Sequence, residues 1–241
     1  MVKINISNLT KDYKKQRVID NLNLRIDFEK NNILGVLGPN GSRKSTILRL
    51  LAGVLLNTDG VISLENQDDN YVKWTKQNSI YVSSGERGLM SKLNIIDNAI
   101  YFGALKGISK EKILDNLYKL SEEFNFMDLI NKKFDTMSTG QRKKAQLLCA
   151  LSFDMKLILL DEPSNGLDLD SQKELEAIIQ SIGKKEETQI VISSHDINLL
   201  SDMCNQYIYI REGKLIKSIE NKKSNSQLID MYNNYLKEGE I

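Results

Sequence analysis

The chain has 241 residues, with 33 lysines and arginines against 32 aspartates and glutamates, so its formal net charge at pH 7 is +1. This length allows a substantial core, and we expect one domain of two lobes. The near-neutral charge argues against the long basic surface of a nucleic-acid-binding protein, and one histidine with two cysteines that lack paired spacing cannot build a zinc site.

Apolar runs such as residues 50–56 are far too short to span a bilayer, and no signal-peptide pattern opens the chain. We therefore expect a protein of the reduced cytosol, in which the two cysteines stay free. Any membrane crossing must then come from a partner.

Alternating apolar residues predict antiparallel strands in the first thirty residues. Val2, Ile4 and Ile6 alternate with polar residues, residues 22–28 repeat the pattern, and a charged turn over 14–17 separates the two runs. Tyr13 follows the first run. An aromatic residue at this place can stack on a nucleotide base, although packing is the simpler interpretation of the residue alone.

The stretch 33–50 predicts a strand, a tight loop and a helix. An apolar run over 33–37 is followed by Gly38-Pro39-Asn40-Gly41-Ser42-Arg43-Lys44-Ser45-Thr46, and apolar residues then return at helical spacing. Such a loop directs backbone N–H groups toward an anion in front of a helix N-terminus, which predicts a phosphate-binding site. Lys44 would supply charge for the β- and γ-phosphates. Ser45 would offer a hydroxyl to Mg²⁺, with the Thr46 oxygen nearby.

Arg43 departs from this pattern, because G-x-x-x-x-G-K-[ST] has its second glycine at position 43. A long side chain where backbone and phosphate approach closely predicts steric conflict or a strained dihedral angle. Two alternatives are a guanidinium group that folds outward and one that bonds a phosphate oxygen.

Residues 58–89 predict two short strands, and residues 93–152 predict a helical lobe. A turn over 58–60 leads into the alternating residues 61–64, and the strand over 79–82 runs into a glycine-containing loop. Beyond it, apolar residues recur at three- and four-residue spacing, as in amphipathic helices inserted after a sheet.

Near the end of this lobe stand Met137-Ser138-Thr139-Gly140-Gln141, followed by a helical pattern. Ser138 is a natural N-cap, and Gly140 lets an anion approach the backbone at the positive end of the helix dipole. Taken alone, the segment is better explained as a simple capped helix.

Residues 157–163 form a continuous apolar run that ends in Asp161, Glu162 and Pro163. A buried parallel strand would bring Asp161 beside the phosphate loop, where a carboxylate holds Mg²⁺ through its water shell. Glu162 is one residue further, so we expect it to point away from Asp161 and to polarise an attacking water.

The remaining residues predict a turn over 164–168, a helix to about residue 182 and a buried strand over 189–192 that ends before His195. Parallel sheets bind ligands at the carboxyl ends of their strands, so His195 could hydrogen-bond the γ-phosphate and the attacking water. Residues 207–219 predict a hairpin, and residues 224–237 a closing helix.

These motifs follow one another in the order found in ABC ATPases, and over residues 3–219 the chain resembles the ATP-binding subunit of an ABC transporter. The resemblance implies an α/β fold: a P-loop ATPase core with an N-terminal antiparallel β subdomain and an inserted α-helical subdomain. We expect a single domain over 1–241, with the core at 1–84 and 153–220, the helical subdomain at 85–152 and a C-terminal helix at 221–241.

The resemblance also implies ATP and Mg²⁺ as cofactors. Tyr13 would stack on adenine, residues 38–46 would form the Walker A loop with Lys44 as a catalytic residue, and Ser45 and Asp161 would bind the metal. Glu162 would be the catalytic base and His195 the switch histidine, with the D-loop at 165–168. Ser138, Thr139, Gly140 and Gln141 would form the signature segment, which in the family binds the γ-phosphate of ATP held by the opposite subunit.

This division of the site implies a second ABC ATPase subunit, in a homodimer or a heterodimer. The resemblance also implies a membrane permease subunit as a partner, and we expect no nucleic acid. We expect a cytoplasmic protein, peripheral on the inner face of the cell membrane. The family's Q-loop glutamine aligns with Gly85, although the neighbouring Glu86 could supply an oxygen. This departure affects the usual contact of the Q-loop with Mg²⁺ and the usual coupling of the nucleotide site to the membrane partner.

Three functions are compatible with these motifs. The first is the ATPase of a transporter, more in keeping with export of a drug, an antibiotic or a peptide, because residues 82–84 and 86–89 look similar to exporter cassettes. The second is a hydrolysis-impaired cassette that lends its signature segment to a partner; Arg43 and Gly85 favour it, and the intact acids and histidine oppose it. The third, a soluble protein of DNA repair or translation, is disfavoured by the single cassette and the short spacing from Lys44 to Ser138.

Overall fold

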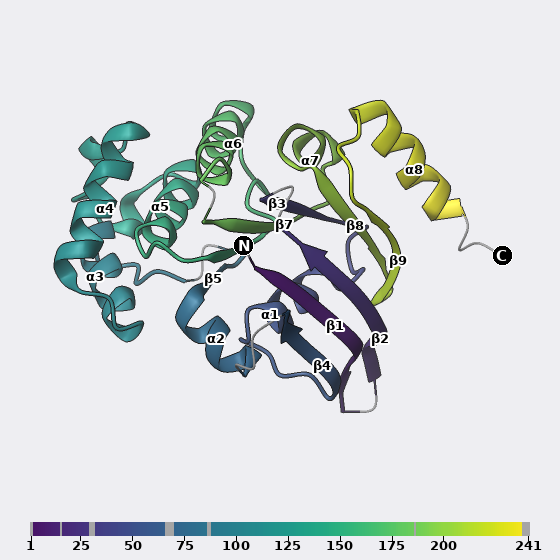
Figure 1. The fold of residues 1–241 in the computed structure, drawn as a ribbon. Helices are drawn as coiled ribbons and strands as arrows, with labels where there is room; N and C mark the ends of the chain where they lie inside the picture. Colours follow the sequence, from purple (N-terminus) through teal and green to yellow (C-terminus); the bar gives the residue numbers. More distant parts are fainter. Residues whose placement is uncertain are drawn as a thin grey trace.

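The computed structural model describes residues 2–14, 16–28, 32–65, 70–85, 88–185 and 187–237. Figure 1 shows two sheets with a helix packed between them, and a lobe of helices beside the larger sheet. The predicted α/β class, with its antiparallel β subdomain and inserted helices, is confirmed.

The smaller sheet is antiparallel, as the alternation of the first residues predicts. It contains β1 (Lys3–Tyr13), β2 (Gln16–Asp27) and β4 (Asp59–Leu64) in the order β2-β1-β4. Ile4 pairs with Ile26, and the side chains of Ile4, Ile6, Leu22, Leu24 and Ile26 lie in one core. Period-two alternation therefore buries one face of the sheet.

The larger sheet has the order β5-β6-β7-β3-β8-β9, and only β9 runs antiparallel to its neighbour. The strands are β3 (Ile33–Leu37), β5 (Ser79–Val82), β6 (Leu157–Asp161), β7 (Gln189–Ser194), β8 (Gln206–Arg211) and β9 (Lys214–Ile219). Helices and strands cover both faces, so β3, β6 and β7 are continuous buried runs. Their carboxyl ends meet at one edge.

Helix α1 (Lys44–Leu51) lies between the two sheets. Its residues Ile47 and Leu48 are fully buried in a core that contains side chains of both sheets. Helix α2 (Tyr71–Asn78) packs into the same core through Trp74. The helix itself was not predicted, because one turn of apolar spacing is too short to stand out from a loop.

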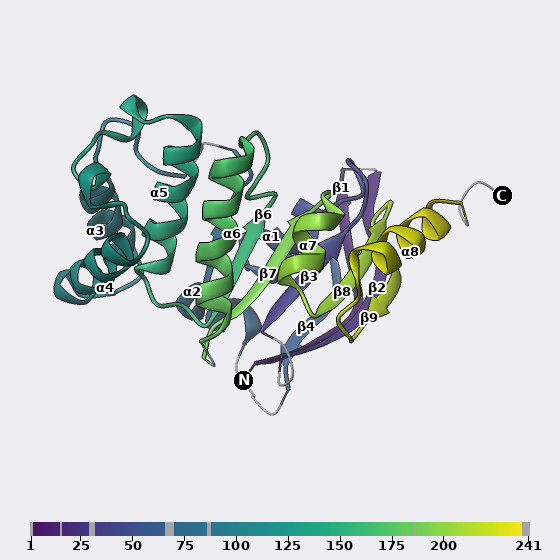
Figure 2. The same ribbon diagram turned by 90° about the horizontal axis from the view of Figure 1, so that it is seen from above.

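The remaining helices cover the face of the larger sheet that lies opposite α1, and some of them continue beyond the edge of the sheet (Figure 2). They are α3 (Ile95–Leu105), α4 (Lys110–Glu123), α5 (Thr139–Leu151), α6 (Leu169–Gly183), α7 (Ile197–Met203) and α8 (Asn225–Lys237), with short 3₁₀ turns at Met127–Leu129 and Phe134–Thr136. Helices α3 to α5 form the predicted helical lobe. Its boundaries at 85 and 152 stay a prediction.

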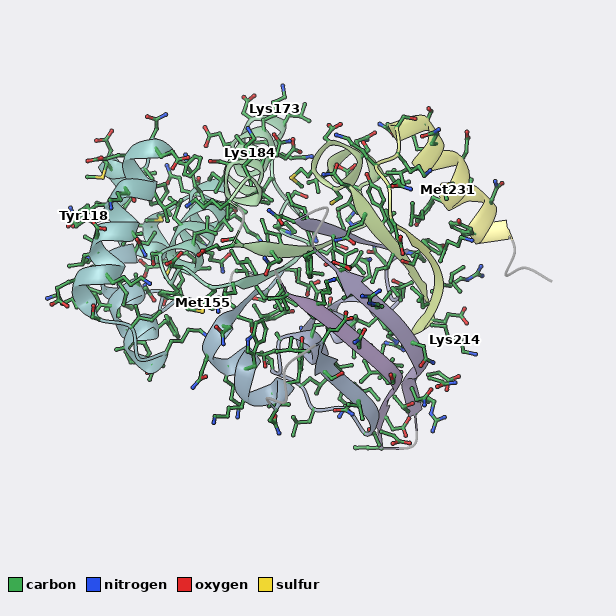
Figure 3. The ribbon with its side chains drawn as sticks, viewed as in Figure 1. Tyr118, Met155, Lys173, Lys184, Lys214 and Met231 are labelled. Atoms are coloured by element: carbon green, nitrogen blue, oxygen red, sulfur yellow. The ribbon has the colours of Figure 1, made fainter. Side chains whose placement is uncertain are left out.

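The β8–β9 turn fixes the phosphate loop against the smaller sheet. Gly213 donates its N–H to the Ser42 carbonyl at 3.1 Å and accepts from the Asp20 N–H at 3.3 Å. Lys214, labelled in Figure 3, forms an ion pair of 3.4 Å with Asp20. A Cβ atom at Gly213 would lie 2.0 Å from the Val18 carbonyl oxygen, so this close approach requires glycine.

Candidate nucleotide-binding and active site

The phosphate loop joins β3 to α1 and encloses a cavity of about 210 Å³, which residues 40–46 line. Its shape depends on glycine, because a Cβ atom at Gly38 would lie 2.3 Å from the Ile210 carbonyl oxygen, and Gly41 has a φ of +81°. The Ser42 N–H closes the turn on the Pro39 carbonyl at 3.1 Å. The loop thus has the curvature of an anion-binding site.

Polar groups of this loop are available for an anion. In the part of the chain that the structure describes, no acceptor contacts the N–H groups of Gly41, Arg43, Lys44 and Ser45. The Ser42 hydroxyl is buried there without a partner. Because unpaired N–H groups lie at the N-terminus of α1, the loop fits a phosphate group.

Arg43 adopts the strained dihedral angle expected of a residue in a glycine position, with φ 83° and ψ 19°. This left-handed conformation costs about 1 kcal/mol for a residue with a Cβ atom. The side chain is exposed, and no other described residue pairs with its guanidinium group. The loop accommodates arginine through its backbone, and the exposed side chain borders the cavity.

Lys44 is buried with its ammonium group among three acceptors. Its Nζ atom lies 2.8 Å from the Gly38 carbonyl, 3.3 Å from the Pro39 carbonyl and 3.2 Å from Oε1 of Glu162. A cation held inside the loop by neutral carbonyls and one carboxylate is positioned to bind phosphate oxygens.

Strand β6 brings Asp161 beside the loop, as the sequence predicts. Its side chain is 1% exposed; Oδ1 accepts from Ser45 Oγ at 2.9 Å and from Ser193 Oγ at 2.7 Å, and Oδ2 accepts from the Tyr81 hydroxyl at 2.8 Å. Ser193 and Tyr81 were not predicted. They reach Asp161 because β5 and β7 flank β6, an order that the sequence does not reveal.

Ser45 and Asp161 offer hard oxygen ligands of the kind that Mg²⁺ prefers. Within the described ranges, no group of three or more acidic, histidine or cysteine side chains is arranged to hold a metal ion by itself. The residues therefore fit a Mg²⁺ ion that arrives with the phosphates of a nucleotide and keeps part of its water shell.

Glu162 lies between Lys44 and His195. Its Oε2 atom is 2.8 Å from Nδ1 of His195, and its N–H donates to the Ser193 carbonyl at 3.1 Å. The expectation that it points away from Asp161 is wrong: with φ 46° the chain leaves the extended conformation, and both carboxylates reach the loop. His195 has a side chain 46% exposed and can contact a ligand.

Tyr81 donates a hydrogen bond as a neutral phenol, and burial raises the pKa of this phenol further, to about 12. Its hydroxyl accepts from Nε of Arg49 at 3.1 Å and donates to Asp161. The hydrogen bond to Tyr81 in turn raises the pKa of Arg49. This pair was also missed from the sequence, since no motif marks it.

The signature segment forms a capping box at the start of α5. Ser138 accepts from the Gln141 N–H at 3.3 Å, and Gln141 Oε1 accepts from the Ser138 N–H at 3.1 Å, which confirms Ser138 as the N-cap. A Cβ atom at Gly140 would lie 2.4 Å from Ser171 Oγ on α6. No hydrogen bond among the described residues joins residues 138–141 to the phosphate loop.

Tyr13 lies at the end of β1 with 46% of its surface exposed, and the ammonium group of Lys11 is 5.3 Å from its ring centre. The ring is available for stacking. Gly85 is exposed, and its carbonyl accepts from Gln146 of α5 at 3.2 Å; Lys143 binds the Ser84 carbonyl. Helix α5 thus holds this loop, while Glu86 lies outside the described residues.

Comparisons with known proteins agree with this geometry. A family model described as ABC transporter matches residues 21–165. The chain is 33% identical to the ABC transporter ATP-binding protein NatA of Bacillus subtilis (strain 168), over 84% of this chain and 82% of that protein. It is 31% identical to the lantibiotic transport ATP-binding protein SrtF of Streptococcus pyogenes, over 97% of both.

The fold also matches that of a solved cassette. A dimeric structure of the ATP-binding cassette MJ0796, bound to ADP and Pi, superposes with a TM-score of 0.75 over 92% of this chain and 99% of that one, at 23% identity. The family match, the relatives and the phosphate loop agree. The chain therefore belongs to the ABC transporter family, as one of its ATP-binding, ATP-hydrolysing subunits.

Proposed function

We propose that the chain works as one half of a cassette dimer in which each nucleotide lies between the phosphate loop of one subunit and the signature segment of the other. The capping box holds residues 138–141 on their own lobe, and their described hydrogen bonds do not reach the loop. Helix α5 and helix α1 occupy different parts of the molecule (Figure 1). The site is therefore divided, and a second subunit would complete it.

Within this site, the loop N–H groups and Lys44 bind the β- and γ-phosphates. Phosphate oxygens are better acceptors for Lys44 than the carbonyls of Gly38 and Pro39, because they carry charge. Ser45 and Asp161 hold Mg²⁺, which neutralises phosphate charge when bound. Tyr13 stacks on the adenine ring.

Hydrolysis depends on Glu162. Once Lys44 binds phosphate, the ion pair between Lys44 and Glu162 weakens, and Glu162 accepts the proton of the attacking water. His195 orients this carboxylate through Nδ1 and leaves its other ring nitrogen for the γ-phosphate. The observation that carries this proposal is the row Lys44–Glu162–His195, whose contacts are 3.2 and 2.8 Å.

A second candidate function is that of a hydrolysis-impaired cassette that lends its signature segment to a partner cassette. The strained backbone at Arg43 and the absence of a side chain at Gly85 favour it. The Arg43 side chain is exposed, however, and Glu162 keeps both of its partners. The hydrolysing subunit is therefore our preferred proposal.

An apolar groove beside β5 supports docking of a membrane permease. The groove has a volume of about 500 Å³ and is lined by residues of β5, α3, α5 and the loop over 88–89. Leu105 of α3 borders it and is 70% exposed. We propose that an apolar helical segment of the permease, on its cytoplasmic side, occupies this groove, because a single subunit would leave the area exposed to water.

We further propose a place on the inner face of the cell membrane and a role in export of a drug, an antibiotic or a peptide. Among the described residues, no helix is both long enough and apolar enough to cross a bilayer. The relative SrtF, by its name, serves lantibiotic transport, which supports antibiotic or peptide cargo.

The dimer predicts different effects for two equivalent N-cap serines. Ser138 caps α5 and Ser109 caps α4 through the same type of hydrogen bond. Ser138→Ala and Ser109→Ala should each lower the free energy of unfolding by about 1 kcal/mol. Only Ser138→Ala should lower steady-state ATP hydrolysis, because its hydroxyl contacts the nucleotide of the partner. Urea unfolding and phosphate release measure the two effects.

Equal hydrolysis by the two variants at matched folded concentration would contradict the shared site. Mixing Ser138→Ala with the loop variant Lys44→Met adds a second check. In a homodimer of this chain, mixed dimers contain one intact composite site, so activity should partly return. If only an added partner cassette restores activity, the working unit is a heterodimer.

A further inference from the structure

A row of side-chain contacts runs from α1 through β5 to Asp161. Arg49, in the last turn of α1, donates from Nε to the Tyr81 hydroxyl at 3.1 Å, and its guanidinium carbon lies 5.9 Å from the ring centre. The Tyr81 hydroxyl donates onward to Oδ2 of Asp161 at 2.8 Å. A cationic donor polarises the phenol O–H and strengthens the second hydrogen bond.

The two oxygens of Asp161 have different partners. Oδ1 accepts from Ser45 and Ser193, and Tyr81 is the donor to Oδ2 in the described structure. The side chain is 1% exposed, so water does not replace these donors. A carboxylate fixed at both oxygens has little freedom to rotate, and the Tyr81 bond keeps Oδ1 toward Ser45.

The position of Tyr81 on β5 explains how it reaches Asp161. β5 is an edge strand that pairs with β6 in parallel, with Tyr81 opposite Leu159. Strand alternation packs Tyr81 against the core around α1 and its neighbours Ile80 and Val82 against the other core, and all three residues border the apolar groove. Tyr81 thus connects the strand beside the groove with the carboxylate.

We propose that Tyr81, held by Arg49, is a positioning residue for Asp161 and sets the affinity of the site for Mg²⁺ bound with nucleotide. This inference rests on the proposed role of Ser45 and Asp161 as metal ligands and deepens it. Partners behind a metal-ligating carboxylate typically contribute about 10- to 100-fold to metal affinity, because they orient the ligand.

The test measures the gain in nucleotide affinity that the metal provides. A non-hydrolysable ATP analogue is titrated onto the full chain, once with EDTA and once with saturating Mg²⁺, and the ratio of the two dissociation constants is the metal gain. Tyr81→Phe should lower the metal gain by about tenfold and leave the affinity in EDTA unchanged, because the phosphate loop is intact.

Tyr71→Phe is the matched control. The Tyr71 hydroxyl is buried and donates to the Leu51 carbonyl of α1 at 2.7 Å, a contact that involves no carboxylate. Tyr81→Phe loses the hydrogen bonds to Arg49 and Asp161, and Tyr71→Phe loses its one buried hydrogen bond, so both variants should lower the thermal unfolding midpoint. Tyr71→Phe should keep the full metal gain.

A double substitution separates positioning from a merely structural contribution. Arg49→Met should lower the metal gain by about threefold, and Arg49→Met combined with Tyr81→Phe should be no worse than Tyr81→Phe alone, since Arg49 acts through Tyr81. If the two substitutions acted independently, the loss of metal gain in the double variant would be the product of the two single losses.

An unchanged metal gain in Tyr81→Phe, or an equal loss in Tyr71→Phe, would overturn the inference and leave the proposed function standing. A wild-type chain that binds the analogue without any metal gain would overturn both the inference and the proposed metal ligands. A wild-type chain that fails to bind the analogue would overturn the proposed function itself.

Discussion

Replacing Glu162 by glutamine is expected to lower ATP hydrolysis by about 10²- to 10⁴-fold, the usual contribution of a general base. The carboxylate has His195 at 2.8 Å and Lys44 at 3.2 Å, so it is oriented, and glutamine has nearly the same shape but cannot accept a proton. ATP binding should persist and should not weaken, because the substitution removes the carboxylate that competes with phosphate for Lys44.

Phosphate release and equilibrium binding of ATP measure the two quantities. Glu187→Gln is the matched control: this residue is exposed beyond α6, and the same chemical change there should leave both quantities unaltered. If Glu162→Gln turns over ATP at the wild-type rate, Glu162 is not the base. Loss of binding together with turnover would point to a structural role of the ion pair.

Replacing Lys44 by methionine is expected to weaken ATP binding by about 10- to 100-fold, or 1.4–2.8 kcal/mol. The ammonium group is the one cation that the described loop holds buried, and its three acceptors show that it is directed into the loop. Methionine has a similar length but no charge, so the phosphates lose their charged donor.

Titration of ATP against the purified variant gives this affinity. Lys184→Met serves as the control, because Lys184 follows α6 at the surface and lies away from the loop (Figure 3). The account would be contradicted if both variants bound ATP equally well. Circular dichroism shows whether Lys44→Met remains folded, since the change also leaves Glu162 without its cation.

The sequence predicts the core of this fold well where one periodicity dominates. The buried parallel strands ending at Leu37, Asp161 and Ser194 are continuous buried runs, and residues 22–28 alternate between the core and the surface. Helix α2 was missed for two reasons. Its eight residues bury only one side, against α1, and its composition is like that of a loop. Local patterns thus identify elements that bury whole faces.

Within the site, the residues of the phosphate loop and the acids at the end of β6 could be predicted, because consecutive positions in one motif stay together in space. Tyr81, Arg49 and Ser193 could not, since their contacts with Asp161 depend on the strand order β5-β6-β7. The direction of Glu162 was predicted wrongly because its positive φ ends the strand alternation. Sheet order and single dihedral angles are set by the tertiary fold.

The central claim is that the loop binds ATP with arginine at position 43. Equilibrium binding of Mg²⁺-ATP to the wild-type chain and to Arg43→Gly tests it most directly, because binding needs neither a permease nor turnover. Arg43 already has the left-handed conformation and an exposed side chain, so the two affinities should agree within about threefold, which is less than 1 kcal/mol. Binding by the glycine variant alone would contradict the account and would favour the hydrolysis-impaired cassette.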